Sequence, residues 1–375
     1  MVSPNSKVTL ERDRLQVLLD AIRVEGFRIL GPTVRDEAIV YDDVSRVEDL
    51  PIGWTDEQEA GRYRLCKRSD QEVFGFISGP HSPKQFLFLP QEIIWKVVRE
   101  GNGFRFVDTP RTCAPLAFFG VRSCDLRAID IQDKVFMPVD PRYRARREKT
   151  LIVAVQCGLA GKTCFCASMG TGPRATGNFD LALTEIFEKP RHYFLVELGT
   201  ERGADIMEHV PHLGATASDL EKAEAATRRA LSQMGRTMET SDVKDLLYRN
   251  YEHPQWDDVA KRCLTCANCT LVCPTCFCGT LKDTTDLSGD QSERWRQWDS
   301  CFNLEHSYLH GGNIRPSPKA RYRQWMTHKL ATWQDQFGTS GCVGCGRCIT
   351  WCPVGIDITA EVRAIRDSEN RHGND

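Results

Sequence analysis

The sequence predicts two domains: an α/β or α+β domain over residues 1–240, and a mostly α-helical, cysteine-rich domain over residues 241–375. Apolar runs of strand length alternate with helical segments in the first part, which is typical of a sheet covered by helices. After about residue 240 these runs disappear, and cysteine, tryptophan and arginine become frequent. A chain of 375 residues is long enough for two hydrophobic cores.

The N-terminal elements are assigned from apolar spacing. Leu15, Leu18, Leu19 and Ile22 recur at helical intervals, and Gly26 is placed to end that helix. Further strands are predicted at 86–89, 116–121, 151–155 and 193–196, and further helices at 91–100, 126–136 and 220–234. In the C-terminal domain the predicted helices are 243–251, 255–262, 318–337 and 358–367.

Charge and hydropathy exclude several classes of protein. The 49 basic and 51 acidic residues give a net charge of −2, which argues against a nucleic-acid binder that neutralises phosphates. The first residues lack the basic start and apolar run of a signal peptide. No apolar stretch reaches the roughly 18–20 residues that cross a bilayer. We therefore expect a cytoplasmic protein without a membrane span.

Two cysteine motifs carry the strongest functional signal among the 17 cysteines. Both have the C-x2-C-x2-C-x3-C-P spacing of bacterial ferredoxins, which holds [4Fe–4S] clusters. Their members are Cys263, Cys266, Cys269, Cys273 with Pro274, and Cys342, Cys345, Cys348, Cys352 with Pro353. Structural zinc also uses C-x2-C pairs, but it needs neither the third cysteine nor the proline.

The fourth cysteine of such a motif ligates the other cluster in two-cluster ferredoxins. We therefore assign Cys263, Cys266, Cys269 and Cys352 to cluster 1, and Cys342, Cys345, Cys348 and Cys273 to cluster 2. The long segment between the motifs exceeds that of compact bacterial ferredoxins. With helices in it, the domain resembles the helical dicluster ferredoxins of fumarate reductase and heterodisulfide reductase.

Four cysteines of the N-terminal domain form a further candidate site. Cys124 and Cys157 follow predicted strands, at the sheet edge where open α/β folds place ligands, and Cys164 and Cys166 come shortly after. A third cluster, small buried residues and a redox-active pair are the three interpretations that the spacing leaves open.

The remaining cysteines carry weaker expectations. Cys276, Cys278 and Cys301 are three thiols, one short of a four-ligand site, so we expect them to pack around the clusters rather than to ligate one. Cys66 and Cys113 are isolated in the sequence, and core packing is expected for both.

The sequence resembles the beta subunits of the sulfhydrogenase family and the similar iron–sulfur subunit of anaerobic sulfite reductase. The resemblance covers nearly the whole chain and rests on residues 119–129, 164–166, 269–276, 298–301 and 342–348. It implies an iron–sulfur subunit of a cytosolic hetero-oligomer without its own substrate-converting site. Such a subunit connects a flavin- and NAD(P)-binding subunit to the small subunit of a nickel–iron hydrogenase, beside its large subunit.

Two alternatives remain open at this point. An anaerobic sulfite reductase would use the same kind of subunit with a different partner. A flavin-binding catalytic subunit, similar to coenzyme F420-reducing proteins, is the other. No G-x-G-x-x-G sequence lies between a predicted strand and helix, so we do not expect flavin in this chain.

Overall fold

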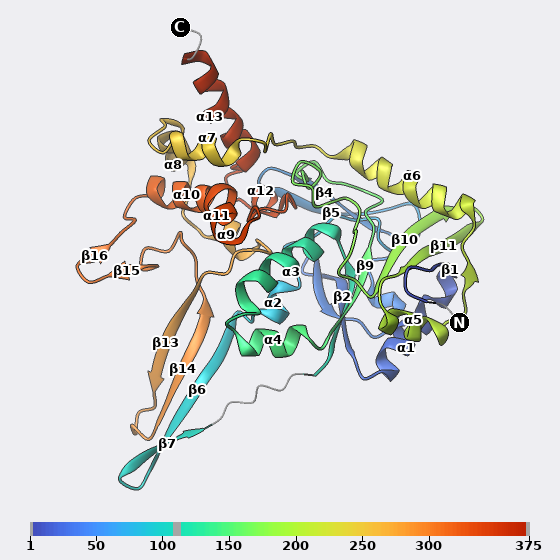
Figure 1. The fold of residues 1–375 in the computed structure, drawn as a ribbon, viewed down its shortest axis with the longest axis horizontal. Helices are drawn as coiled ribbons and strands as arrows, with labels where there is room; N and C mark the ends of the chain where they lie inside the picture. The colour runs from blue at the N-terminus through green and yellow to red at the C-terminus, as the bar shows by residue number, and fades with distance from the viewer. Residues whose placement is uncertain (1–2, 108–113, 373–375) are drawn as a thin grey trace.

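The computed structural model describes residues 3–107 and 114–372. Its largest element is an eight-stranded sheet in the order β12-β1-β11-β10-β9-β8-β2-β3 (Figure 1). Strands β2, β8, β9 and β10 are parallel neighbours, and the outer strands are antiparallel. The bounds are β1 Lys7–Glu11, β2 Arg28–Arg35, β3 Ala38–Asp43, β8 Leu116–Val121, β9 Thr150–Val155, β10 Leu181–Glu188, β11 Arg191–Leu198 and β12 Leu213–Gly214.

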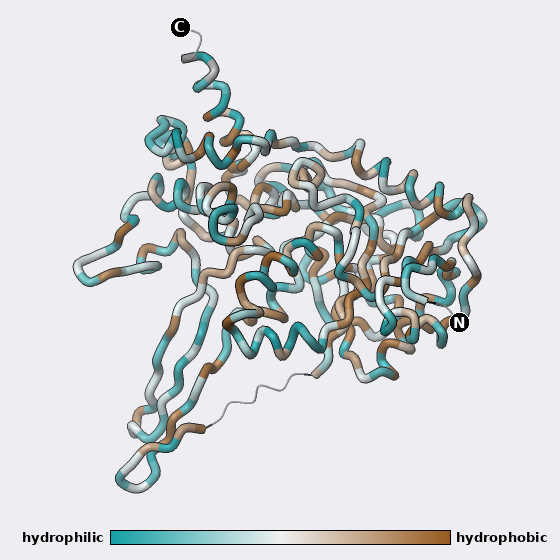
Figure 2. The backbone as a smooth tube through the Cα atoms, in the orientation of Figure 1, coloured by the Kyte–Doolittle hydropathy of each residue, from teal (hydrophilic) through white to brown (hydrophobic). Residues whose placement is uncertain are grey.

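Helices cover both faces of this sheet. This is expected, because its central strands carry apolar side chains on both sides. Phe119 and Val153 pack into a core with α1 and α5, whereas their neighbours Phe118 and Ile152 pack on the other face with α2, α3 and α4. Helix α6 also contacts β10 and β11. The helices are α1 Leu15–Val24, α2 Lys84–Leu87, α3 Ser123–Phe136, α4 Pro141–Arg147, α5 Glu201–Glu208 and α6 Ala217–Gln233. Figure 2 shows hydrophobic residues gathered along the central sheet.

A second sheet, in the order β13-β14-β6-β7, extends away from the body as an arm (Figure 1). It joins strands that lie far apart in the sequence: β6 Gln91–Glu100, β7 Gly103–Val107, β13 Gly279–Thr285 and β14 Gln291–Trp298. Two small hairpins complete the strands: β4 Trp54–Glu59 with β5 Arg62–Lys67, and β15 Tyr308–Leu309 with β16 Gly312–Asn313. Short 3-10 helices lie at Arg12–Arg14 (η1) and Val47–Asp49 (η2).

The C-terminal helices surround the two cysteine motifs. Their shared core contains Trp256, Tyr322, Met326, Leu330 and Ile349, and cysteines of both motifs pack against it. The helices are α7 Val243–Arg249, α8 Gln255–Arg262, α9 Asn268–Leu271, α10 Pro318–Thr327, the π-helical η3 His328–Thr332, α11 Trp333–Phe337, α12 Arg347–Thr350 and α13 Ile358–His372. Over the described ranges, no helix combines the length and the apolar character of a membrane span.

Most predicted elements of the main sheet are confirmed, but two neighbouring assignments are wrong. Residues 116–121, 151–155 and 193–196 lie in β8, β9 and β11. The segment 91–100, predicted as a helix, is strand β6, and the predicted strand 86–89 begins inside helix α2. Ile93 and Val97 recur four residues apart as in a helix, but β-branched side chains favour a strand, and pairing with β14 decides the outcome.

A mostly helical C-terminal domain is not confirmed, because β13 and β14 form a long hairpin within it. Every residue of β13 is exposed, so the segment lacks the buried apolar alternation by which strands are recognised. The arm sheet also pairs β14 with β6 across the predicted boundary. The division at residue 240 stays a prediction.

Candidate metal centre

The first motif forms a tight loop between α8 and α9. Cys263 caps the C-terminus of α8, and Cys269 lies in α9. Between them Thr265 and Ala267 adopt left-handed φ values of 52° and 67°, which turns the chain sharply. The Thr265 amide then donates a hydrogen bond to Cys263 Sγ at 3.4 Å. Amide hydrogen bonds of this kind stabilise thiolate ligands and tune cluster potentials.

One cavity collects the thiols that were assigned to cluster 1. Cys263, Cys266 and Cys269 line it together with Cys352 from the second motif. The rest of the wall is largely apolar, with Phe302, Tyr322, Trp325, Ile356 and Ile358. Burial raises the pKa of the Cys263 and Cys269 thiols, so their thiolate forms need a positive partner here. The donor set and the apolar wall fit an iron–sulfur cluster.

The second motif lies beside the first. Burial raises the pKa of Cys348, and the nearby thiols of Cys342, Cys345 and Cys273 raise it further. Cys348 also lines the cavity of the first motif, so the two candidate sites are adjacent. The four residues assigned to cluster 2 therefore lie together, as the crossed ligand pattern requires.

A buried lysine, which sequence reasoning did not single out, contacts this second group. Lys329 is 4% exposed, and its Nζ lies 3.2 Å from Cys273 Sγ, 3.1 Å from Thr275 Oγ1 and 3.1 Å from Gly341 O. A hydrogen bond with Cys276 and the charge of Lys329 lower the pKa of Cys273, against the effect of its burial. The lysine therefore supplies a fixed positive charge to one thiolate of the group.

The four cysteines of the N-terminal domain also line one common cavity. Cys124 lies in the first turn of α3 after β8, Cys157 follows β9, and Cys164 and Cys166 belong to the next loop. Because β8 and β9 are parallel neighbours, their carboxyl ends meet at one edge of the sheet. Burial raises the pKa of all four thiols. Cys345 of the second motif lines the same cavity.

Two glycines allow the second motif to approach this N-terminal cysteine loop. Gly344 and Gly346 have φ values of +64° and +76°. A Cβ on Gly344 would lie 2.6 Å from the carbonyl oxygen of Phe165, and one on Gly346 would lie 2.4 Å from that of Thr163. The Phe165 amide also donates to the Gly344 carbonyl oxygen at 2.9 Å. The two cysteine loops are therefore in direct backbone contact.

A buried ion pair also stabilises the contact between the second motif and the N-terminal cysteine site. Arg347 donates to both carboxylate oxygens of Asp125 at 2.7 and 2.8 Å, and each side chain is 1% exposed. Arg347 follows Cys345 by two residues and Asp125 follows Cys124 directly. The pair thus fixes the position of the second motif against the N-terminal cysteine site.

No group of three or more His, Cys, Asp or Glu side chains in residues 3–107 and 114–372 is arranged to hold a single metal ion. A cubane cluster differs from one ion, because each thiolate binds a separate iron and the four sulfurs stand further apart.

The remaining cysteines have varied surroundings. Cys276 hydrogen-bonds Cys273, and Cys278 hydrogen-bonds Cys301 and His306. Sequence reasoning missed His306; its only signal was its position five residues after Cys301. Cys66 lies on β5 and is only half-buried, so the expectation of core packing is wrong for it. Cys113 lies outside the described residues.

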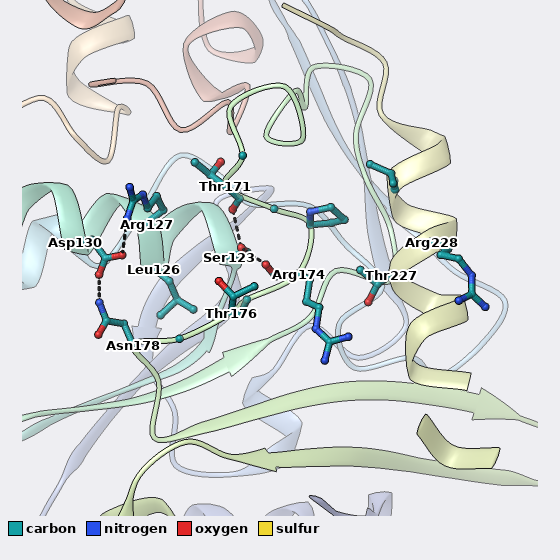
Figure 3. A pocket seen from close by; sticks show the side chains of 16 residues that line it. Ser123, Leu126, Arg127, Asp130, Thr171, Arg174, Thr176, Asn178, Thr227 and Arg228 are labelled. Atoms are coloured by element: carbon teal, nitrogen blue, oxygen red, sulfur yellow. Dashed lines mark hydrogen bonds and ion pairs between the residues drawn. The ribbon is translucent and has the colours of Figure 1, made fainter. Parts of the chain in front are cut away.

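An open pocket of about 640 Å³ lies next to the N-terminal cysteine site (Figure 3). The loop from Gly170 to Asn178 forms one side, and α3 and α6 contribute Arg127 and Arg228. The Ser123 hydroxyl shares its one proton between the carbonyl oxygens of Thr171 and Arg174, at 2.6 and 2.8 Å, and so ties this loop to α3. A Cβ on Gly172 would come within 2.9 Å of Cys166 Sγ, so little separates the pocket from that thiol.

Comparison with known proteins agrees with this geometry. A model of the 4Fe-4S dicluster domain matches residues 262–356, which include both cysteine motifs. The chain is 28% identical over 345 residues to sulfhydrogenase 2 subunit beta of Pyrococcus furiosus, covering 91% of this chain and 92% of that protein. No solved structure matches the chain.

The fold and the paired motifs thus define an iron–sulfur protein that contains a dicluster domain. Beyond this domain, the chain is similar along nearly its whole length to a sulfhydrogenase beta subunit.

Proposed function

We propose that this chain relays electrons between two partners of a sulfhydrogenase-type complex. Its role as an iron–sulfur electron-transfer subunit is supported by the dicluster domain and by the relative. The finer proposal is that one partner binds flavin and NAD(P), and that the other is the small subunit of a nickel–iron hydrogenase. Clusters of this type accept and release single electrons.

The observation that carries the proposal is the meeting of cysteines from both motifs. Cys263, Cys266 and Cys269 share a cavity with Cys352, and Cys348 of the other assigned group lines it too. Two sites joined in this way suit electron relay. The wall of the first site consists largely of thiols and apolar side chains, which suits a cluster better than a polar substrate.

We extend the relay to a third [4Fe–4S] site formed by Cys124, Cys157, Cys164 and Cys166. Four thiols that converge on one cavity favour ligation over separate packing roles. A redox-active pair is disfavoured, because reactive thiols have a lowered pKa and burial raises the pKa of these four. Contact with the second motif through Cys345 would place all three sites in one path.

Replacing Cys345 by serine tests the relay. We expect the purified variant complex to lose about four irons per chain and its NAD(P)-coupled activity, because one cluster lacks a ligand. The hydrogenase partner should keep its own activity with an artificial dye, since that reaction bypasses this chain. Iron analysis and the two activity assays measure these effects.

Cys66→Ser is the matched control, because Cys66 lies on β5, outside the three cysteine groups, and its thiol donates to the Arg64 carbonyl oxygen. That variant should keep full iron content and both activities. Unchanged NAD(P)-coupled activity in a Cys345→Ser complex that has lost iron would rule out the relay.

The partner itself is tested by analysing the intact complex. A co-purifying subunit that contains nickel supports the hydrogenase proposal. A complex without nickel that reduces sulfite supports the sulfite reductase alternative.

The pocket of Figure 3 favours one second candidate, a flavin bound by the N-terminal domain itself. Arg127, Arg174 and Arg228 line it and could pair with a phosphate. Flavin absorbance in the anaerobically purified chain, lost on Arg174→Ala, would support this candidate. A chain with iron and no flavin would exclude it.

A further inference from the structure

Two cysteines outside the assigned cluster ligands lie at the base of the arm, where the β13–β14 hairpin meets the C-terminal core. Cys278 immediately precedes β13, and Cys301 follows β14 by three residues. The antiparallel register pairs Gly279 with Trp298, and the Asp299 amide donates to the Cys278 carbonyl oxygen at 2.9 Å. The hairpin therefore brings the two cysteines together, and each thiol shifts the pKa of the other.

A histidine and a carboxylate complete the arrangement. His306 lowers the pKa of the Cys278 thiol, and its Nδ1 lies 2.7 Å from Asp299 Oδ2. Their side chains are 18% and 12% exposed. A thiol, an imidazole and a carboxylate in series form the usual device for activating a cysteine, because the carboxylate orients the ring and stabilises its charge.

We infer that Cys278 and Cys301 form a dithiol–disulfide couple that exchanges two electrons with the iron–sulfur clusters. Reduction breaks the Cys278–Cys301 S–S bond and takes two electrons, delivered one at a time, and one proton from solvent. The proton binds Cys301, and Cys278 remains a thiolate beside the His306 imidazolium. Oxidation reverses each of these changes. The inference rests on the electron-relay function proposed above.

The acid–base states support this division of roles. The hydrogen bonds from Cys301 and His306 lower the pKa of Cys278 to about 4, and the hydrogen bonds with Cys278 and Asp299 raise the pKa of His306 to about 9. A cysteine with a low pKa beside a neighbouring thiol is typical of redox-active dithiols. The third nearby thiol, Cys276, interacts instead with Cys273, the last cysteine of the first motif.

The couple lies near cysteines assigned to both clusters, Cys269 of cluster 1 and Cys273 of cluster 2. Ser300 Oγ lies 2.7 Å from Thr270 Oγ1, and Thr270 is the neighbour of Cys269. Phe302, which follows Cys301, lines the first cavity. Cys276, two residues before Cys278, contacts Cys273. The potentials of ferredoxin-type clusters overlap those of protein dithiols, so exchange in both directions is feasible.

The test is differential alkylation of the cluster-loaded full chain without oxygen. Samples are equilibrated in dithiothreitol redox buffers and quenched in denaturant with N-ethylmaleimide. Disulfides are then reduced and labelled with a heavy form of the reagent, and peptides are identified by mass spectrometry. We expect equal heavy labelling of Cys278 and Cys301 in oxidising buffer, and its loss once the clusters are reduced by a photochemical one-electron donor. Cys278→Ser should abolish the heavy label on Cys301, and Cys301→Ser that on Cys278.

Three results would overturn the inference. The first is the absence of the disulfide at every potential. The second is loss of iron or zinc from Cys278→Ser or Cys301→Ser, which would make these thiols metal ligands. The third is a disulfide that persists while the clusters are reduced. Failure of the relay itself would instead appear in the Cys345→Ser complex, where the disulfide can still form in dithiothreitol buffers.

His306→Gln separates activation from simple packing. This variant keeps a polar side chain of similar size but cannot form the imidazolium. At neutral pH, alkylation of reduced Cys278 by iodoacetamide should slow by at least about tenfold, because less thiolate is present. An unchanged rate would contradict the proposed role of His306.

Discussion

Arg347→Met is expected to destabilise the folded chain by about 3–5 kcal/mol, the cost of removing one partner from a buried ion pair. Arg347 and Asp125 are each 1% exposed and bonded through two hydrogen bonds. Arg347 also donates to the carbonyl oxygens of Gly79 at 2.7 Å and His81 at 3.1 Å. Its loss leaves a buried carboxylate and two carbonyl groups without this donor. Anaerobic urea unfolding, followed by tryptophan fluorescence and by the visible absorbance of the clusters, measures the effect.

Two further variants test whether the lost stability comes from breaking the buried ion pair or from removing any arginine. Arg64→Met removes an exposed pair with Glu57 and should leave the urea midpoint nearly unchanged, because exposed ion pairs contribute little. The double variant Arg347→Met/Asp125→Asn should recover part of the loss, because no unpaired charge stays buried. An Arg347→Met chain as stable as the wild type would show that the pair does not hold the two cysteine loops together.

Lys329→Met is expected to lower the reduction potential of one cluster by roughly 100 mV. A unit charge about 7 Å from a cluster centre, at an effective dielectric constant near 20, stabilises an added electron by about 2 kcal/mol. Lys329 contacts Cys273 Sγ at 3.2 Å and is buried, so solvent does not replace its charge. An EPR-monitored redox titration of the chain measures the shift.

The control is Lys329→Arg, which keeps the charge and should shift the potential much less. Lys319→Met removes a partly exposed lysine that pairs with Asp257 and should leave every midpoint unchanged. A Lys329→Met chain with wild-type midpoints for all clusters would contradict the assignment of Cys273 as a ligand.

The sequence predicted the parts of the fold where a local pattern reflects the buried environment. The run Leu116–Val121 is buried at every residue, and it is strand β8 as expected. Strands β13 and β14 were missed because β14 pairs with β6, which lies about 200 residues earlier in the sequence, and because every residue of β13 is exposed. The strand β6 was assigned to a helix for the same reason, since its partner could not be identified from local spacing.

The candidate site was likewise predicted only in part. Crossed ligation was predicted from spacing alone, and the structure brings Cys352 to the loop of Cys263, Cys266 and Cys269. The meeting of Cys124 and Cys157 followed from their positions after neighbouring strands. The roles of Lys329 and Arg347 could not be predicted, because only the tertiary structure shows which of 49 basic residues are buried beside cysteines.

The most direct test of the account is the iron and acid-labile sulfide content of the chain purified without oxygen, together with its reduced EPR spectrum. Three clusters predict about twelve irons and twelve sulfides per chain, with interacting signals from neighbouring clusters. About eight of each would keep the dicluster relay and remove the N-terminal site from it. Zinc without iron would contradict the central claim that this chain transfers electrons through iron–sulfur clusters.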